Sequence, residues 1–286
     1  MARSMRVIRS ARQMAGAARR WERQGRRIGV VPTMGALHEG HASLIRRAAA
    51  ENDVTIVTIF VNPLQFGPGE DFRRYPRTLR RDLALARACG ADVVFAPAVR
   101  DLYPPGFHTR VELGALAERW EGKLRPGHFG GVATVVAILF QLTRPTRAYV
   151  GRKDYQQACI IRRLVRDLAF PLAVRVLPTV RERGGLAMSS RNAYLSPAER
   201  VRALVLSRSL AAAAARIRAG ERRGASVASA LRRAMRRAPG VRVDYAAAVD
   251  AATLEPLALL RGRVALLVAA RVGRTRLIDN LLVDVP

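Results

Sequence analysis

The sequence predicts an α/β protein, with a Rossmann-like parallel sheet over residues 1–179 and a smaller α+β domain over residues 180–286. Short apolar runs rich in β-branched residues alternate with amphipathic helical patterns through the first part of the chain. This alternation is typical of a parallel sheet covered by helices on both faces. After about residue 180, two helical stretches come first and three apolar runs come last. That order indicates a separate α+β domain.

The elements of the first domain follow from local patterns. The basic N-terminal segment lacks the continuous apolar core of a signal peptide, so we expect an ordinary first helix there. Residues 53–61 are β-branched and strand-like, and the helical pattern over 78–90 ends at a glycine, as many helices do. The apolar run at 130–142 fits either a helix or a buried strand. The other expected elements are strands at 26–31, 91–97, 147–151 and 172–180, and helices at 39–52 and 155–168.

The elements of the second domain begin with a strong helix-start signal. Ser196 and Pro197 supply a capping hydroxyl and a backbone angle suited to the first turn of a helix. A long helix is therefore expected over 197–224, and a second helical stretch follows it. The three apolar runs are expected to be strands, at 241–250, 263–273 and 275–285.

The composition bounds the class of protein. The chain has 286 residues and is 50% hydrophobic, but it has no run of about 20 apolar residues that would span a membrane. Cys89 and Cys159 are isolated, which fits free thiols in a reducing compartment, so we expect a cytoplasmic protein. The formal net charge is +28, yet all basic residues except Lys123 and Lys153 are arginines spread along the chain. This indicates a bias in residue usage, so no nucleic-acid or membrane partner is expected; a nucleic-acid surface is the alternative.

Two histidines, His38 and His41, lie where a loop rich in glycine becomes a helix, in the stretch GVVPTMGALHEGHASLIRRA. A zinc site is disfavoured, because helical zinc motifs space histidines at i and i+4 and this pair is at i and i+3. A second interpretation makes one histidine a helix cap and packs the other. A third uses the whole segment, since glycines let the backbone bend round a ligand and a helix start attracts anions. We favour this third interpretation, in which the imidazoles donate hydrogen bonds to a phosphoryl group.

Six segments of the chain carry a further signal: PTMGALHEGH, FVNPLQFGPGEDFRRYPRT, RPGHFGGVATVV, GRKDYQQACIIRRLVRDL, TVRERGGLAMSSRNAYLSP and RLIDN. Together they span essentially the whole chain. They resemble the pantoate–β-alanine ligases, whose histidine motif is a variant of the HIGH motif of the nucleotidyltransferase superfamily.

This resemblance implies a reaction. The expected enzyme condenses (R)-pantoate with β-alanine in pantothenate and coenzyme A biosynthesis, releasing AMP and diphosphate from ATP. The expected route passes through an enzyme-bound pantoyl adenylate. The resemblance also implies a magnesium ion, a homodimer, and a second domain that covers the active site. Another nucleotidyltransferase of the same superfamily is the alternative within this class.

The resemblance also implies roles for particular residues. His41 corresponds to the family's proton donor, and His38 would help to hold the phosphates. Lys153 and Arg191 would neutralise the charge of the leaving group, so all four are expected catalytic residues. The ATP-binding residues that it implies are Met34, Gly35, Ala36, Leu37, His38, Glu39, Gly40, His41, Gly151, Arg152, Lys153, Asp154, Val180, Met188, Ser189, Ser190 and Arg191.

Two glutamines and one aspartate complete the implied site. Gln65 and Gln157 match the pantoate-binding glutamines, and Gln65 would also lie near β-alanine. A neutral amide both donates and accepts hydrogen bonds, which suits a hydroxy acid. Asp82 is a candidate magnesium ligand, with an ordinary helix-surface acid as the alternative. The two serines of MSSR equally fit a turn or a helix cap.

Other residues are expected around the site. Asn62 and Tyr75 are expected to shape the pocket, and Arg125 and His128 to lie on a loop over it, since proline and glycine interrupt the pattern there. Arg152 adds positive charge where the family usually has glutamine or glutamate. The departures from the family pattern are Ala42, Gly130 and Arg152.

Overall fold

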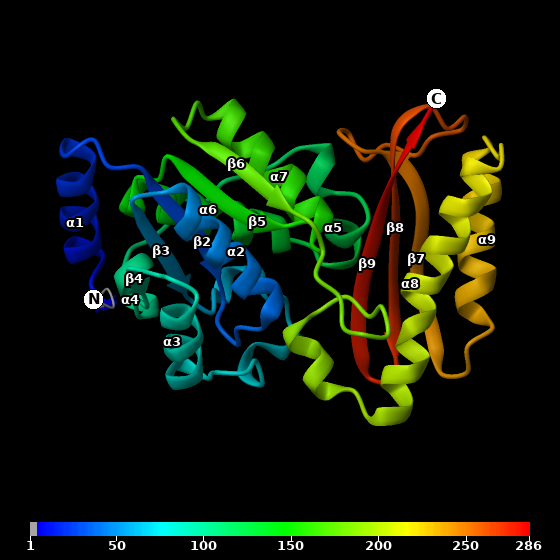
Figure 1. Ribbon diagram of the computed structural model, residues 1–286, viewed down its shortest axis with the longest axis horizontal. Helices are drawn as coiled ribbons and strands as arrows, with labels where there is room; N and C mark the ends of the chain where they lie inside the picture. Colours follow the sequence, from blue (N-terminus) through cyan, green and yellow to red (C-terminus); the bar gives the residue numbers. More distant parts are fainter. Residues whose placement is uncertain (1–4) are drawn as a thin grey trace. The chain divides into compact units, whose positions relative to one another are not determined.

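Six parallel strands form the sheet of the first part of the chain, in the order β1-β4-β3-β2-β5-β6 (Figure 1). From β2 the chain adds β3 and β4 on one side, and later adds β5 and β6 on the other side. The carboxyl ends of β2 and β5 therefore lie at a topological switch point, where open α/β sheets bind ligands. The strands are β1 (Arg6–Ile8), β2 (Ile28–Thr33), β3 (Val54–Ile59), β4 (Val93–Phe95), β5 (Arg147–Gly151) and β6 (Ala173–Leu177).

Helices cover both faces of this sheet. One buried cluster joins the strands to α1, α6 and α7, and a second joins them to α2 and α3. Val30 and Val31 are both fully buried, but Val30 belongs to the first cluster and Val31 to the second. Burial on both faces explains why the strand sequences are continuous apolar runs. The helices are α1 (Ala11–Arg23), α2 (Glu39–Glu51), α3 (Leu79–Ala88), α4 (Val99–Leu102), α5 (Glu121–Leu124), α6 (His128–Thr143) and α7 (Tyr155–Asp167).

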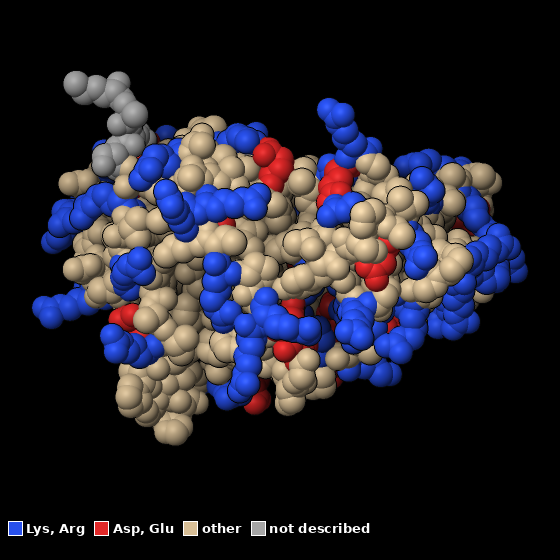
Figure 2. Space-filling view, turned by 90° about the horizontal axis from the view of Figure 1, so that it is seen from below, with Lys and Arg blue, Asp and Glu red and all other residues tan. Residues whose placement is uncertain are grey.

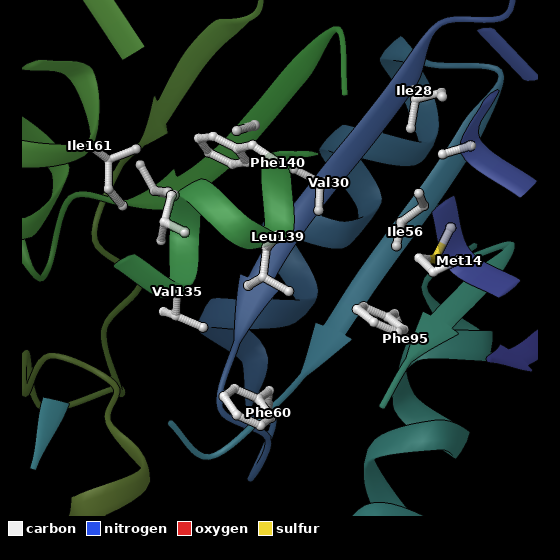
Figure 3. Close-up of a cluster of buried hydrophobic side chains, with 14 of the residues drawn as sticks. Met14, Ile28, Val30, Ile56, Phe60, Phe95, Val135, Leu139, Phe140 and Ile161 are labelled. Carbon is white, nitrogen blue, oxygen red and sulfur yellow. The ribbon is translucent and has the colours of Figure 1, made fainter. Parts of the chain in front are cut away.

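Figure 3 shows the core on the α6 face of the sheet. Val30 of β2 and Ile56 of β3 lie on neighbouring strands, and Leu139 and Phe140 come from α6. All four side chains are at most 3% exposed. This packing fixes the strands whose carboxyl ends carry the candidate site.

The second part of the chain is built on an antiparallel sheet in the order β7-β8-β9. Alternate residues of β8, from Val264 to Val272, share a buried cluster with residues of two helices, as the two-residue period of a strand requires. The elements are α8 (Pro197–Arg218), α9 (Gly224–Arg236), β7 (Val241–Asp250), β8 (Gly262–Val272) and β9 (Thr275–Val285). The predicted fold class, a Rossmann-like parallel sheet followed by a smaller α+β part, is confirmed.

The contacts within the chain divide this computed structural model into two units, and the structure describes residues 5–286. The first unit holds the chain up to Arg152 together with Gln156–Pro178. The second holds Lys153–Tyr155 and Thr179–Pro286. Three residues in the middle of the GRKDYQQ segment therefore belong by contact to the second unit.

Three local predictions need correction or completion. The N-terminal segment contains α1, but residues 6–8 form a strand that pairs in parallel with Val93–Phe95, and this pairing is not visible in the local pattern. The run at 130–142, open between helix and strand, lies inside α6. The sequence predicts His128 on a loop, but it is the first residue of α6 and is buried, because Gly127 with φ 77° ends the turn before it.

The surface carries many basic side chains. Figure 2 shows arginines and lysines distributed over the visible face, with acidic side chains between them. This distribution is the one that a bias in residue usage predicts. Within residues 5–286, no helix is both long and apolar enough to cross a membrane.

Candidate active site

The loop after β2 is held in a tight bend. The Thr33 hydroxyl donates to the Thr58 carbonyl (2.6 Å) and accepts the N–H of Gly35 (3.1 Å). Gly35 and Ala36 then follow with φ of 82° and 50°. Two successive residues with left-handed backbone angles turn the chain sharply. The bend places His38 at the start of α2, on the carboxyl side of the sheet.

His38 and His41 form the cap of α2. The His38 Nδ1 accepts the N–H of Gly40 (3.1 Å), and the His41 Nδ1 accepts the N–H of His38 (3.3 Å). A ring nitrogen that accepts a hydrogen bond carries no proton, so the neutral form of each ring has its proton on Nε2. The ring centroids lie 4.2 Å apart. Both histidines therefore cap the helix, whereas the helix-cap interpretation had one ring capping and the other packed, and each ring keeps Nε2–H as its donor.

Asp82 of α3 holds this loop by hydrogen bonds. It is 1% exposed. Its Oδ2 accepts the N–H of Ala36 (3.0 Å), and its Oδ1 accepts the N–H of Leu37 (2.8 Å). The hydroxyl of Thr78 also donates to Oδ1 (3.1 Å). The carboxylate therefore binds the backbone of the loop, although Asp82 is 46 residues away from Ala36 in the sequence.

Gln65 lies beside the same loop, and its amide is oriented from both ends. Asn62 Nδ2 donates to Gln65 Oε1 (3.0 Å), and Gln65 Nε2 contacts the sulfur of Met34 (3.1 Å). Asn62 is 1% exposed and is itself fixed by the hydroxyl of Tyr103 (2.8 Å) and the carbonyl of Gly131 (3.0 Å). The structure thus brings Gln65 and the histidine loop together through Met34.

A partly buried network supports the backbone of Gln65. Arg125 donates to both carboxylate oxygens of Glu70 (2.7 and 2.6 Å) and to His128 Nε2 (3.0 Å). Since arginine only donates, His128 Nε2 accepts, and its Nδ1–H donates to the Gln65 carbonyl (2.8 Å). Burial is the main reason why the pKa of His128 falls to about 4. The sequence predicts Arg125 and His128 on a loop over the site. In the structure, both instead contact the backbone carbonyl of Gln65.

Two consecutive glutamines of α7 have different environments. Gln156 is 4% exposed; its Nε2 donates to the carbonyls of Leu116 and Arg119, each at 2.8 Å, and its Oε1 accepts the N–H of Glu121 (3.0 Å). Gln157, the predicted site residue, is only partly buried. Sequence reasoning misses the structural role of Gln156, because nothing local distinguishes it from Gln157.

The strand next to β2 at the switch point is β5, and the GRKD segment begins at its last residue. Gly151 ends β5, and a Cβ placed on it would meet no atom within 4 Å. The N–H of Arg152 donates to the carbonyl of Leu177 (2.8 Å), which extends the pairing with β6. These two residues lie in the first unit, with the histidine loop.

Lys153 and Asp154 belong to the second unit. Lys153 Nζ lies 3.2 Å from Asp154 Oδ1, and the Lys153 side chain is 19% exposed. The Asn280 side-chain amide, from the RLIDN segment of β9, donates to the Lys153 carbonyl (2.8 Å). The Tyr155 hydroxyl donates to the Ala251 carbonyl (2.8 Å). The backbone of this lysine is therefore attached to the antiparallel sheet.

The MSSR segment is also well connected within the second unit. Met188 donates its N–H to the Val180 carbonyl (3.0 Å). The Ser189 hydroxyl accepts the N–H of Arg191 (3.2 Å) and caps the 3₁₀-helix Ser190–Tyr194, so the cap interpretation is confirmed for this serine. Nearby, Arg181 forms an ion pair with Asp279 that uses two hydrogen bonds (2.6 and 2.9 Å).

A cavity of about 320 Å³ opens at the carboxyl ends of β2, β3 and β4. Met34 and Gly35 of the histidine loop line one side of it, and Phe60, Thr78 and Asp82 line others. The cavity lies within the first unit. The first residues of the histidine loop therefore border both this space and Gln65.

The arrangement defines a class of protein. A histidine-bearing loop and a capped helix start, at the switch point of a parallel sheet, are the features of a Rossmann-like α/β protein with a site for a phosphorylated ligand. The chain belongs to the pantoate–β-alanine ligase family, whose model, described as Pantoate-beta-alanine ligase, matches residues 6–282. The family and the enzyme expected from the sequence are thereby confirmed.

Relatives and solved structures agree with this family. The chain is 53% identical over 281 residues to the pantothenate synthetase of Moorella thermoacetica, covering 98% of each chain. A crystal structure of pantothenate synthetase from Thermus thermophilus is 50% identical, with a TM-score of 0.92 over 97% of this chain and 99% of that one. The Francisella tularensis pantoate–β-alanine ligase, solved with β-γ ATP and β-alanine, is 36% identical, with a TM-score of 0.79 over 98% of each chain.

Proposed function

We propose that this chain uses ATP to condense (R)-pantoate with β-alanine, giving pantothenate, AMP and diphosphate through an enzyme-bound pantoyl adenylate. The observation that carries the proposal is the pair of imidazoles at the start of α2, whose neutral forms both have the proton on Nε2. Such donors suit phosphoryl oxygens at a helix start. The Francisella ligase, which covers 98% of this chain, was solved with β-γ ATP and β-alanine and supports the same ligands here.

In the first step, the pantoate carboxylate attacks the α-phosphorus of ATP, and diphosphate leaves with the bonding electron pair. His38 and His41 donate from Nε2 to the phosphoryl oxygens as negative charge moves onto the leaving group. Their fixed orientation means that little reorganisation is needed during the reaction. His41 is the proposed proton donor.

Pantoate is proposed to bind at Gln65 and Gln157. Gln65 is held by Asn62 and Met34, so its amide has a defined direction. An amide with a defined direction distinguishes a hydroxyl from a carboxylate, because it offers a donor at one end and an acceptor at the other. β-Alanine is proposed to bind near Gln65 as well.

In the second step, the neutral amine of β-alanine attacks the acyl carbon of the adenylate, the bond to the phosphate oxygen breaks, and AMP leaves. The amine nitrogen then loses a proton as the amide forms. An acyl adenylate is labile, so the reaction requires that water is excluded while it exists.

The remaining ATP contacts are proposed from the family resemblance. Lys153 supplies a mobile point charge to the phosphates, Asp154 an acceptor to the ribose, and Arg191 a further cation. Val180 and Met188–Ser190 complete this set in the second unit, and Gly151 and Arg152 in the first. Each of these segments is firmly hydrogen-bonded within its own unit.

Magnesium, the homodimer and the cytoplasmic location also stand as proposals. The part of the chain that the structure describes has no group of three or more histidine, cysteine, aspartate or glutamate side chains that could hold a metal ion. We therefore propose that magnesium enters with ATP, held mainly by the phosphates, where it neutralises part of their charge. Sedimentation analysis of the purified chain would test the dimer.

The proposed function is tested by diphosphate release. ATP, Mg²⁺ and (R)-pantoate are mixed with the protein, first without and then with β-alanine. We expect a single equivalent of diphosphate without β-alanine, and continuous release with matching pantothenate formation once β-alanine is added. Folded protein that releases no diphosphate in response to pantoate would refute the proposal.

A further inference from the structure

The carboxylate of Asp82 faces the loop and is committed to it. Oδ1 and Oδ2 each accept a backbone N–H, from Leu37 (2.8 Å) and Ala36 (3.0 Å). Thr78 adds a third hydrogen bond (3.1 Å), and the residue is 1% exposed. Hydrogen bonds from backbone N–H groups to an ionised carboxylate are among the stronger ones in proteins.

The loop needs such an anchor because its backbone is strained. Ala36 has φ of 50°, a left-handed backbone angle that is unfavourable for a residue other than glycine. Strained angles persist only where the surroundings hold them. Asp82 accepts the N–H of this strained residue and of the next one, directly before the helix cap at His38.

The same contacts argue against Asp82 as a metal ligand. A carboxylate has about four lone-pair directions, and three hydrogen bonds already occupy most of them here. In nucleotide sites magnesium is held by one or two carboxylates together with phosphates and waters, but here both oxygens of the Asp82 carboxylate already accept hydrogen bonds from the loop. The residues present therefore do not fit the sequence-based expectation of magnesium at this carboxylate.

We infer that Asp82 is a positioning residue that holds the Gly35–Leu37 bend in shape for His38 and His41, and that it does not bind magnesium. The positioning role of Asp82 rests on the proposed function, whereas the contact between Asp82 and the loop does not. It has a chemical consequence. The N–H groups of Ala36 and Leu37 point to Asp82, so the phosphates of ATP receive their hydrogen bonds from the imidazoles and the helix start.

The test compares two matched substitutions, Asp82→Asn and Asp92→Asn. Asp92 also accepts a backbone N–H, from Thr55 (2.8 Å), but it does so where β3 and β4 begin, away from the histidine loop. An asparagine retains one acceptor oxygen and replaces the other by a donor, so Asp82→Asn leaves one loop N–H without its acceptor. Folding of both variants is checked by circular dichroism.

The first readout is amide hydrogen exchange resolved by NMR, which requires no substrate. Asp82→Asn should speed exchange at Ala36 or Leu37 by about tenfold or more and leave Thr55 unchanged. Asp92→Asn should leave exchange at both loop amides unchanged, because the oxygen that asparagine retains can still accept the N–H of Thr55. Unchanged exchange at both loop amides in folded Asp82→Asn would overturn the inference, whether or not the proposed function holds.

The second readout separates the loop from the metal. Asp82→Asn should raise the KM for ATP and lower the rate of diphosphate release by about tenfold or more each, while the Mg²⁺ concentration for half-maximal rate stays within about twofold. A large increase in that Mg²⁺ concentration would restore Asp82 as a metal ligand. If Asp82→Asn does not fold, Thr78→Val removes only the third hydrogen bond and should show the same exchange pattern at smaller amplitude; no change there would overturn the inference.

Discussion

Two helices of the first unit begin with histidines, and the fold orients these rings in opposite ways. At the start of α2, His38 and His41 are partly exposed, and each Nδ1 accepts a backbone N–H. At the start of α6, His128 is 8% exposed, and its Nδ1–H donates to the Gln65 carbonyl. The comparison teaches that a histidine offers Nε2–H to a ligand where the loop backbone uses Nδ1 as an acceptor. The position of a histidine at a helix start does not by itself make its Nε2–H available to a ligand.

The largest expected effect is on catalysis at α2. His41→Ala should lower the rate of pantoate-dependent diphosphate release by about 10²–10⁴-fold, because it removes a donor to the transferring phosphoryl group. The free energy of unfolding should change by only about 1 kcal/mol, the usual effect of losing a cap contact. Rapid-quench measurement of diphosphate gives the rate, and urea denaturation gives the stability.

The control for this prediction is His108→Ala, which removes an exposed histidine outside both helix starts. It should leave the rate unchanged. A His41→Ala enzyme with near-normal turnover would remove the assigned role from His41 and the contrast with α6.

A smaller effect, on stability, is expected at α6. His128→Ala should lower the free energy of unfolding by about 3 kcal/mol, because it opens a cavity and removes one hydrogen-bond partner from the buried Gln65 carbonyl and one from Arg125. His128→Gln keeps a donor and an acceptor and should recover part of that loss. Urea denaturation of both variants measures the difference. A loss below about 1 kcal/mol for His128→Ala would show that the network adds little.

The pH dependence of stability should follow His128 as well. Its pKa is about 4 in the folded protein and about 6.5 in the unfolded chain. Between these values the unfolded chain binds more protons, so acidification destabilises the fold and the full contribution is present only above about pH 6.5. From pH 7 to pH 5 the wild type should lose about 2 kcal/mol more than His128→Gln. Equal losses in the two proteins would contradict the assignment of the low pKa to this ring.

The smallest effect is expected at Glu39, in the first turn of α2. Its carboxylate pairs with Arg46, and the hydrogen bonds from that arginine lower the pKa of Glu39. Because both side chains are about half exposed, Glu39→Gln should change stability by no more than about 0.5 kcal/mol. Because the phosphates of ATP are proposed to bind at the start of α2, removing the negative charge of Glu39 should lower the KM for ATP by about threefold at most. A tenfold rise in that KM would instead make Glu39 a direct contributor to binding.

Much of the fold could be predicted because its signals are local. Strands buried on both faces must be apolar runs, as β2 and β3 are, and the capping box of Ser196 and Glu199 marks the start of α8 within four residues. The histidine loop was visible for the same reason. The glycines, the imidazoles and the helix that they cap lie within one short segment.

The support of the site could not be predicted, because its partners are distant in sequence. Asp82 reaches a loop 45 and 46 residues away, and His128 reaches the carbonyl of Gln65 63 residues away. The short strand β1 forms only because β4 offers it an edge.

The sequence by itself therefore determined most of the elements, the family and the candidate reacting groups, since each of these is encoded in neighbouring residues. Only the tertiary structure decided which histidine is buried, which of two adjacent glutamines is structural, and what the carboxylate of Asp82 contacts. These outcomes depend on burial and on hydrogen-bond geometry, and both exist only once distant segments have packed together.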